Sequence, residues 1–223
     1  MVRAYQYASG VPSARTTVKR HPERGVYDRD VIDAILDEAL ICHVGFSIEG
    51  QPFVIPTIHA RDGDVLYIHG SPGSRMLRSL RSGVDTCVTV TLLDGLVLAR
   101  SVYNHSMNYR SVVVVGRAGE VTDPQEKLRA MRCVVEHILP GRWEDARQPS
   151  EKEIKATTIL ALALTEASAK IRSGPPTDDE DDVGLPVWAG VIPLALQTAD
   201  PLPDDGVSSS PPSYVAEYER PRA

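Results

Sequence analysis

Apolar residues recur at helical spacing in three stretches of the chain. The first stretch follows Asp28, the second follows Ser74 and ends at Gly83, and the third follows Asp123 and Pro124. Aspartate and serine are common helix caps, and proline suits the first helical position. The apolar positions are Val31, Ile32, Ile35, Leu36, Ala39 and Leu40, then Met76, Leu77 and Leu80, then Leu128, Met131, Val134, Val135 and Ile138. Each stretch predicts a helix with one buried face.

Between these helices, short apolar runs alternate with turn residues. Glu49-Gly50 and Asp62-Gly63 each separate two such runs, and a pair of this kind is a strong local signal for a β-hairpin. The predicted strands are residues 41–48, 52–60, 65–69, 86–92, 97–102 and 109–121. Near the end, Ser150 to Glu153 forms a capping box, whereas residues 157–165 alternate as a strand does, so we expect a short helix and then a strand.

These elements predict a mainly β protein with α-helices, of the α+β class. Six or seven short strands would form a small antiparallel barrel with helices on its outside or at its ends. Residues 1–27 are polar and basic without periodicity, which predicts an N-terminal arm over the body or over a partner subunit. Residues 28–195 are expected to form one domain, and the Pro-, Ser- and Asp-rich residues 196–223 a disordered tail.

Composition and charge narrow the classes of partner. The net charge of −6 argues against a nucleic-acid binder, since neutralising phosphates requires a basic face. No apolar run is long enough to cross a bilayer, and the first ten residues lack the apolar region of a signal peptide, so we expect a cytoplasmic protein without membrane contact. Cys42, Cys87 and Cys133 are widely spaced among apolar residues, which predicts buried reduced thiols.

The join between the strand at residues 65–69 and the helix after Ser74 is a candidate anion site. The chain turns here through Gly70 and Gly73. The first N–H groups of a helix lack partners and the helix dipole is positive there, so Ser74 and Arg75 could hold a phosphate. An ordinary turn that Ser74 caps, with Arg75 in solvent, explains the same pattern equally well.

Other polar side chains give weaker signals. His69 ends a predicted strand, where imidazole could transfer a proton near neutral pH or could only hydrogen-bond the next turn. The histidines lack the close spacing of a zinc site and no G-x-S-x-G sequence is present, so neither a metal site nor a serine hydrolase is expected. Lys170 and Arg172 could face an anionic substrate or cofactor, or form a solvated basic end of a strand.

Four segments in their order along the chain resemble a known family. They are HVGFSIEGQPFVIPTIHARDGDVLYIHGSPGSRML, HSMNYRSVVVVGRAGEV, LTEASAKIR and PVWAGVIPL. With their connections they cover residues 27–194, and they resemble the FMN-binding split β-barrel proteins related to pyridoxamine 5'-phosphate oxidase. The branch of nitroimidazole-resistance proteins and flavin-nucleotide-binding proteins is the most similar. The resemblance implies a six- to seven-stranded antiparallel split β-barrel with peripheral helices.

The resemblance also implies an FMN held at the interface of a homodimer. Ser74 and Arg75 match the serine and arginine that bind the FMN phosphate. His69 matches a histidine that lies near the flavin in the nitroimidazole-resistance branch, where it is a candidate catalytic proton donor. Trp188 resembles a late tryptophan that approaches the flavin from the second chain. The other implied flavin contacts are Val54, Ile55, Pro56, Thr57, Ile68, Arg110 and Ser111.

Two features depart from the pyridoxamine phosphate oxidases. Met76 stands where those enzymes have a basic residue after the serine-arginine pair, and Arg15, Lys19 or Arg20 of the arm could replace the missing cation. The C-terminal arginine-and-histidine pattern that holds pyridoxal phosphate is absent from the sequence. Oxidation of a vitamin B6 phosphate is therefore not expected.

The function that the resemblance implies is that of an FMN-dependent oxidoreductase. The flavin would transfer a hydride to or from a small organic substrate such as a nitro compound or quinone, with a nicotinamide nucleotide as a candidate electron donor. Three alternatives stay open. They are a non-enzymatic flavin-binding or redox-sensing protein, a haem-binding protein with His69 as axial ligand, and a protein that uses a deazaflavin.

Overall fold

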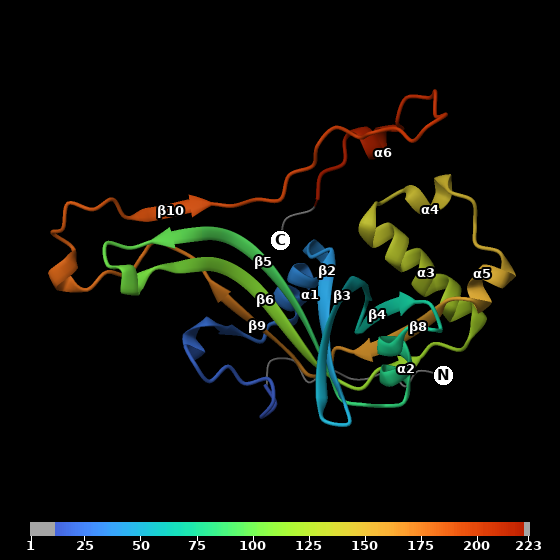
Figure 1. The fold of residues 1–223 in the computed structure, drawn as a ribbon, viewed down its shortest axis with the longest axis horizontal. Coiled ribbons are helices and arrows are strands. Elements are labelled where there is room, and N and C mark those ends of the chain that lie inside the picture. Colours follow the sequence, from blue (N-terminus) through green and yellow to red (C-terminus); the bar gives the residue numbers. More distant parts are fainter. Residues whose placement is uncertain (1–11, 221–223) are drawn as a thin grey trace.

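The ten strands found within residues 12–220, the part of the chain that the computed structural model describes, form one antiparallel sheet (Figure 1). Their order is β1-β9-β6-β5-β2-β3-β4-β8-β7, and β10 pairs with β5 outside this series. The strands are β1 (Gly25–Val26), β2 (Ile41–Ile48), β3 (Gln51–Asp62), β4 (Val65–Gly70), β5 (Thr86–Leu98), β6 (Ser106–Gly116), β7 (Gly119–Glu120), β8 (Thr158–Ala163), β9 (Ala167–Arg172) and β10 (Gly190–Pro193). The helices are α1 (Arg29–Glu38), α2 (Arg75–Arg81), α3 (Pro124–Ile138), α4 (Arg142–Asp145), α5 (Glu151–Lys155) and α6 (Ser213–Ala216), with 3-10 turns η1 (Pro22–Arg24), η2 (Val102–Asn104) and η3 (Glu180–Asp182). The predicted fold class is confirmed.

Local sequence signals place most of these elements. The Asp28 carboxylate accepts hydrogen bonds from the N–H groups of Asp30 and Val31 and so begins α1. Ser150 and Glu153 form the predicted capping box of α5, in which each side chain accepts a bond from the backbone of the other residue. The number of strands exceeds the six or seven predicted for two reasons. β1 and β10 are too short to leave a periodic pattern, and the single strand predicted at residues 109–121 is divided into β6 and β7.

Strand β5 corrects the prediction of separate strands at residues 86–92 and 97–102. It runs without a break from Thr86 to Leu98, and its register with β6 shifts between Leu93 and Gly95. Asp94-Gly95 has the composition of a turn, but here it forms a bulge. A Cβ atom on Gly95 would lie 3.1 Å from the carbonyl oxygen of Ile192, so the glycine allows β10 to pair closely at this point.

The long strands divide the sheet into two parts. β3 pairs with β2 through residues 51–58 and with β4 through residues 59–62, so it passes from one part to the other. Figure 1 shows β5 and β6 as a long curved pair that extends toward β10, whereas α3, α4 and α5 lie at the opposite end of the molecule, beside β8. This arrangement agrees with the predicted split barrel.

Two apolar clusters fill the interior. The larger one joins α1 and α2 to both parts of the sheet, and its fully buried members include Ile32, Leu36, Val44, Leu66, Leu77, Leu80, Val90, Val112 and Leu162. The smaller one lies between α3 and the β4–β8 pair and contains Tyr67, Val121, Ala130 and Ile159. The predicted apolar positions within α1 and α2 belong to the larger cluster or pack against it, whereas of those predicted for α3 only Met131 packs against the smaller one and Ile138 is exposed.

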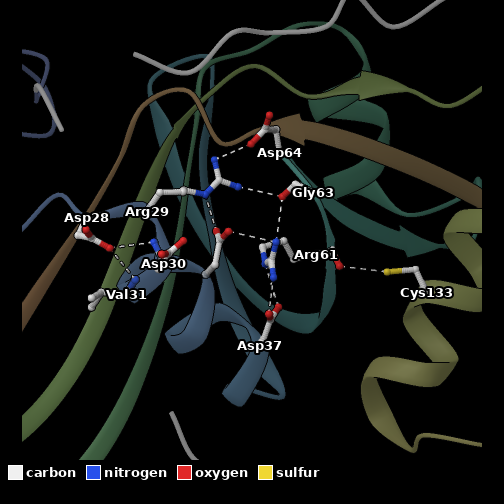
Figure 2. Close-up of polar contacts among 10 residues, drawn as sticks. Asp28, Arg29, Asp30, Val31, Asp37, Arg61, Gly63, Asp64 and Cys133 are labelled. Carbon is white, nitrogen blue, oxygen red and sulfur yellow. Dashed lines mark hydrogen bonds and ion pairs between the residues drawn. The ribbon is translucent and has the colours of Figure 1, made fainter. Parts of the chain in front are cut away.

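A network of charged residues fastens α1 to the turn between β3 and β4 (Figure 2). Arg29 and Arg61 both donate to the carbonyl oxygen of Gly63, at 2.9 and 3.1 Å. Arg61 also binds Asp37 with its guanidinium fork and lies 3.2 Å from Asp33. Burial raises the pKa of Asp33, although both arginines act in the opposite direction. The network fixes the orientation of α1 over the sheet.

The two ends of the described chain contact the body. In the arm, Arg15 pairs with Glu166, and Lys170 Nζ donates to the carbonyl oxygen of Arg20 at 3.0 Å. In the tail, α6 is followed by Arg220, whose guanidinium donates to backbone carbonyl oxygens at the ends of α1 and α3. The arm, domain and tail boundaries at residues 27 and 195 stay a prediction. Within residues 12–220, no helix combines the length and the apolar character needed to span a membrane.

Candidate functional site

His69 lies at the end of β4, opposite Ile159 of β8, and lines a cavity of about 300 Å³. Its Nδ1 is enclosed and has no hydrogen-bond partner within residues 12–220. Burial lowers the pKa of His69, so the ring is neutral at pH 7. The residue as a whole is half-buried, but an enclosed ring nitrogen without a partner is uncommon, because buried polar atoms normally find one. The alternative that His69 hydrogen-bonds the turn after its strand does not match this geometry.

The wall of this cavity is mainly apolar and comes from α3 and the segment that follows it. Its apolar members are Met131, Val134, Val135, Trp143, Ala146 and Pro149. Glu136 positions the segment, because its carboxylate accepts bonds from the N–H groups of Gly141 and Trp143, at 2.8 and 2.9 Å. The tryptophan is thereby held next to α3.

Polar side chains lie at the same cavity. Arg147, Gln148 and Glu153 line it, and Arg147 binds the Glu153 carboxylate with both terminal nitrogens, at 3.0 and 2.7 Å. The Arg147 guanidinium and the bonds from Ser150 lower the pKa of Glu153 to about 2. The cavity thus combines an apolar wall, one unpaired imidazole and one ion pair.

The predicted anion site at α2 contains both features that the sequence left as alternatives. Ser74 Oγ accepts a bond from the N–H of Leu77, at 3.4 Å, so it caps the helix. Arg75 is exposed, and its guanidinium lies 4.2 Å from the centre of the Phe53 ring. Within residues 12–220, Arg75 has no carboxylate partner, so its charge is available to an anion.

The predicted contacts on β3 and β4 divide between the two faces of the sheet. Val54 is 64% exposed, and Pro56 is exposed on the same outer face. Ile55 and Thr57 are half-buried on the inner face, because successive side chains in a strand point to opposite sides. Ile68 is fully buried in the core, so only its backbone could reach a ligand.

The sequence and the fold are similar to those of known proteins. A family model described as pyridoxamine 5'-phosphate oxidase matches residues 28–171. The chain belongs to the pyridoxamine 5'-phosphate oxidase family. None of the curated proteins compared with it matches.

Two solved structures are similar to this family member over most of its length. The flavocytochrome Anf3 from Azotobacter vinelandii is 44% identical, with a TM-score of 0.88, and the match covers 93% of this chain and 98% of that chain. The FAD and haem binding protein from Mycobacterium smegmatis is 35% identical, with a TM-score of 0.82, and the match covers 85% of this chain and 95% of that chain. A proposed 5-nitroimidazole antibiotic resistance protein from Bacteroides thetaiotaomicron, 24% identical over 66% of this chain and 86% of that chain with a TM-score of 0.54, shares the fold.

Two adjacent residues predicted to contact a flavin in this family, Arg110 and Ser111, do not point the same way. Arg110 binds Glu38 at 2.5 and 2.9 Å and Asp94 at 2.8 and 3.1 Å, and the hydrogen bonds that it donates to Asp94 and Glu38 raise its pKa. Ser111 lies on the other face of β6, where its Oγ donates to the carbonyl oxygen of Lys170. The structure therefore separates the two side chains.

In a single chain of this family member, Trp188 lies far from α2. It precedes β10 and is 66% exposed, with its ring against Gly190. Figure 1 shows β10 and α2 toward opposite ends of the molecule. The single chain thus brings Ser74, Arg75 and Phe53 together but leaves Trp188 apart.

A second, basic cavity of about 680 Å³ was only partly visible in the sequence. It brings together Arg20, Arg24, Lys170 and Arg172. The sequence marked Lys170 and Arg172 as candidates for an anionic ligand and Arg20 as a spare cation, but it gave no reason to combine them. Pairing of β1 with β9 is what places the arm beside these two residues.

Proposed function

We propose that this member of the pyridoxamine 5'-phosphate oxidase family is a redox protein that binds a flavin and haem. The support from relatives is that two similar structures, at 44% and 35% identity, are of a flavocytochrome and of a FAD and haem binding protein. The observation in this chain that carries the proposal is the neutral, unpartnered ring of His69 in a cavity with an apolar wall.

The residues at this cavity have the chemistry that haem requires. Haem supplies one-electron chemistry at its iron when it is bound. His69 would hold the haem iron, because a neutral imidazole offers a nitrogen lone pair and partial burial lowers the pKa of this ring. Met131, Val134 and Trp143 would pack against the porphyrin and exclude water. Arg147 is the cation that lines the cavity, and the acidic edge of the haem would share it with the Glu153 carboxylate.

The flavin would bind with its phosphate at the start of α2. Arg75 is suited to this role, because its guanidinium is exposed and has no carboxylate partner within residues 12–220. FAD is the preferred cofactor, since the similar protein from Mycobacterium smegmatis is a FAD and haem binding protein, and the FMN implied by the sequence resemblance is the alternative. The flavin supplies hydride and single-electron transfer when it is bound.

A second copy of the chain would complete the flavin site. Ile41, Val54 and Ile58 form an exposed apolar row on the outer face of the β2–β3 pair, which a homodimer would cover. Trp188 would then reach the flavin of the partner subunit. The electron donor would be a nicotinamide nucleotide, and the acceptor a small organic molecule such as a quinone or nitro compound. The three unpaired cysteines suit a cytoplasmic location.

The visible spectrum of the purified full-length chain tests the haem assignment. We expect a Soret band in the wild type and its loss or a large shift in His69→Ala. The matched control is His43→Ala, which removes an exposed imidazole from β2 and should leave the band unchanged. A Soret band that is the same in His69→Ala and in the wild type would overturn the role of His69.

Release of the flavin by heat tests the other half of the proposal. A released flavin that chromatographs as FAD supports the preferred cofactor. A flavin that chromatographs as FMN would support the alternative cofactor. A colourless protein that also fails to take up either flavin would overturn the flavin assignment. Reduction of the bound flavin by NADH or NADPH, and faster reoxidation with an added quinone, would support enzymatic turnover.

A further inference from the structure

The basic cavity concentrates positive charge in a chain whose net charge is −6. Its walls come from the arm, from η2 and the start of β6, and from the end of β9. Four lining side chains are the cations Arg20, Arg24, Lys170 and Arg172, and no acidic residue within residues 12–220 lines the cavity. A volume of about 680 Å³ is within the usual range for small-molecule sites.

Arg172 is the most informative of these cations because it is buried without an opposite charge. It is only 9% exposed, and it donates to the Asn108 side chain and to the carbonyl oxygens of Gly174 and Pro175. Within residues 12–220 no carboxylate pairs with it, in contrast to Arg110, which binds two. Burial and the nearby Arg24 charge lower the pKa of Arg172. An uncompensated buried charge is costly, so an anion in the cavity would stabilise this arrangement.

The other cations are also largely free of acids. Lys170 donates to the backbone carbonyl oxygen of Arg20, which holds the ammonium between the arm and β9. Arg24 has only a long contact of 3.7 Å with Glu23, an exposed residue outside the cavity lining. Arg20 has no ion pair within the described residues. Three or four positive groups around one space match the charge of a diphosphate better than that of a single carboxylate.

Aromatic rings complete the lining. Tyr103 of η2 is 89% exposed, an unusual position for a large aromatic side chain without a partner. Tyr109 and His105 line the same cavity, so flat rings lie next to the cations. Aromatic rings of this kind commonly stack on nucleotide bases.

We propose that this cavity binds the adenosine diphosphate part of a nucleotide, with Arg172, Lys170 and Arg24 on the phosphates and Tyr103 on the base. Two sources of that group fit the redox function proposed above, on which this inference rests. One is a bound FAD, whose diphosphate would then lie in this cavity and not at Arg75. The other is a nicotinamide dinucleotide that reduces a flavin whose phosphate lies at Arg75.

The first experiment compares the flavin that co-purifies with four forms of the full-length protein. These are the wild type, Lys170→Gln, Arg24→Gln and, as matched control, Arg117→Gln, which removes the same charge from an exposed ion pair elsewhere. Melting temperatures verify that each variant is folded, and Lys170 and Arg24 are partly exposed, so folding should be retained. If the cavity holds the ADP half of FAD, the two cavity variants lose FAD or carry FMN instead, whereas the control keeps FAD.

The second experiment titrates ADP into the flavin-loaded proteins by calorimetry. If the cavity binds a nicotinamide dinucleotide, ADP binds to the flavin-loaded wild type. Each cavity variant then lowers the affinity for ADP about 10- to 100-fold, the usual effect of a lost charge-assisted hydrogen bond. The Tyr103→Ser variant should also bind ADP more weakly but should bind inorganic pyrophosphate as the wild type does. In this case the flavin content stays the same in all forms.

The inference is overturned if flavin composition is unchanged in the cavity variants and ADP also fails to bind the loaded protein, or binds all variants equally. The proposed function can fail independently of this result. A protein that binds ADP through Lys170 and Arg24 but contains neither flavin nor a Soret band would retain the nucleotide cavity and contradict only the redox assignment.

Discussion

The imidazole rings of His59 and His137 lie 5.1 Å apart between their centroids, with an angle of 50° between their planes. His59 Nε2 is 3.0 Å from the carbonyl oxygen of Leu36, and His137 Nε2 is 2.9 Å from that of Ala39. Both rings therefore bind the C-terminal end of α1 and connect it to β3 and α3. Burial lowers the pKa of His59 to about 4 and also lowers the pKa of His137, so this junction depends on two neutral imidazoles.

We expect the free energy of unfolding to decrease as the pH falls from about 6.5 to about 4. In the unfolded chain a histidine binds a proton below its ordinary pKa of about 6.5. In the folded chain His59 stays neutral down to about pH 4, so the unfolded state takes up more protons across this range. The stability contribution is complete above pH 6.5 and is lost as the pH falls through the range. A shift of this size corresponds to about 3 kcal/mol in full, of which about 2 kcal/mol is lost by pH 5, and urea denaturation at pH 7.5, 6 and 5 would measure that loss.

A pair of variants separates His59 from the other titrating groups. His59→Gln keeps a donor near Leu36 but does not titrate, so its stability should fall less steeply between pH 7.5 and 5. His21→Gln removes an exposed histidine that contacts Glu23 and should keep the wild-type slope. If His59→Gln and the wild type have the same slope, His59 is not the group responsible.

The helices were predictable from sequence because their signals are local. Asp28, Ser74, Asp123 and Ser150 each cap the helix that follows, and a cap needs only the next few residues. Strand β5 was not, because the bulge at Asp94-Gly95 is stabilised by pairing with β10, almost a hundred residues later. Sequence patterns record which residue types suit a turn, but tertiary pairing decides whether a turn forms.

The same distinction applies to the candidate sites. Ser74 and Arg75 belong to one strand-turn-helix unit, so the sequence placed them together. The acids that bind Arg110 are 72 and 16 residues away, and nothing in the sequence near Arg110 indicates them. The basic cavity combines the arm, η2 and β9, which only the sheet order brings together. Long-range pairing therefore limits what sequence reasoning can say about these sites.

Arg110 is expected to contribute to stability and not to flavin affinity. Arg110→Met would leave the carboxylates of Glu38 and Asp94 next to each other without their shared cation. Removal of one partner from a largely buried ion pair costs about 3 kcal/mol, which chemical denaturation would detect. The control Arg117→Met breaks an exposed pair with Asp85 and should cost less than about 1 kcal/mol. Loss of flavin in Arg110→Met with unchanged stability would contradict this assignment and favour a flavin contact.

Arg75, in contrast to Arg110, is expected to contribute to flavin affinity and only slightly to stability. Its guanidinium is exposed above the Phe53 ring, a contact worth about 0.5–1 kcal/mol, and it has no carboxylate partner within residues 12–220. Arg75→Ala should weaken flavin binding by about 1.5–3 kcal/mol, the usual size of a hydrogen bond to a charged group, because the flavin phosphate loses its cation. Fluorescence titration of the flavin would measure the change.

Arg78, one turn further along α2, provides the matched control for this prediction. It is also exposed and has no ion pair within the described residues, so Arg78→Ala removes the same charge from the same helix. An equal loss of affinity in both variants would mean that the flavin phosphate responds to the overall charge of α2. Wild-type affinity in Arg75→Ala would place the phosphate elsewhere, and the basic cavity around Lys170 and Arg172 would then be the next candidate, because it is the other concentration of unpaired cations in this part of the chain.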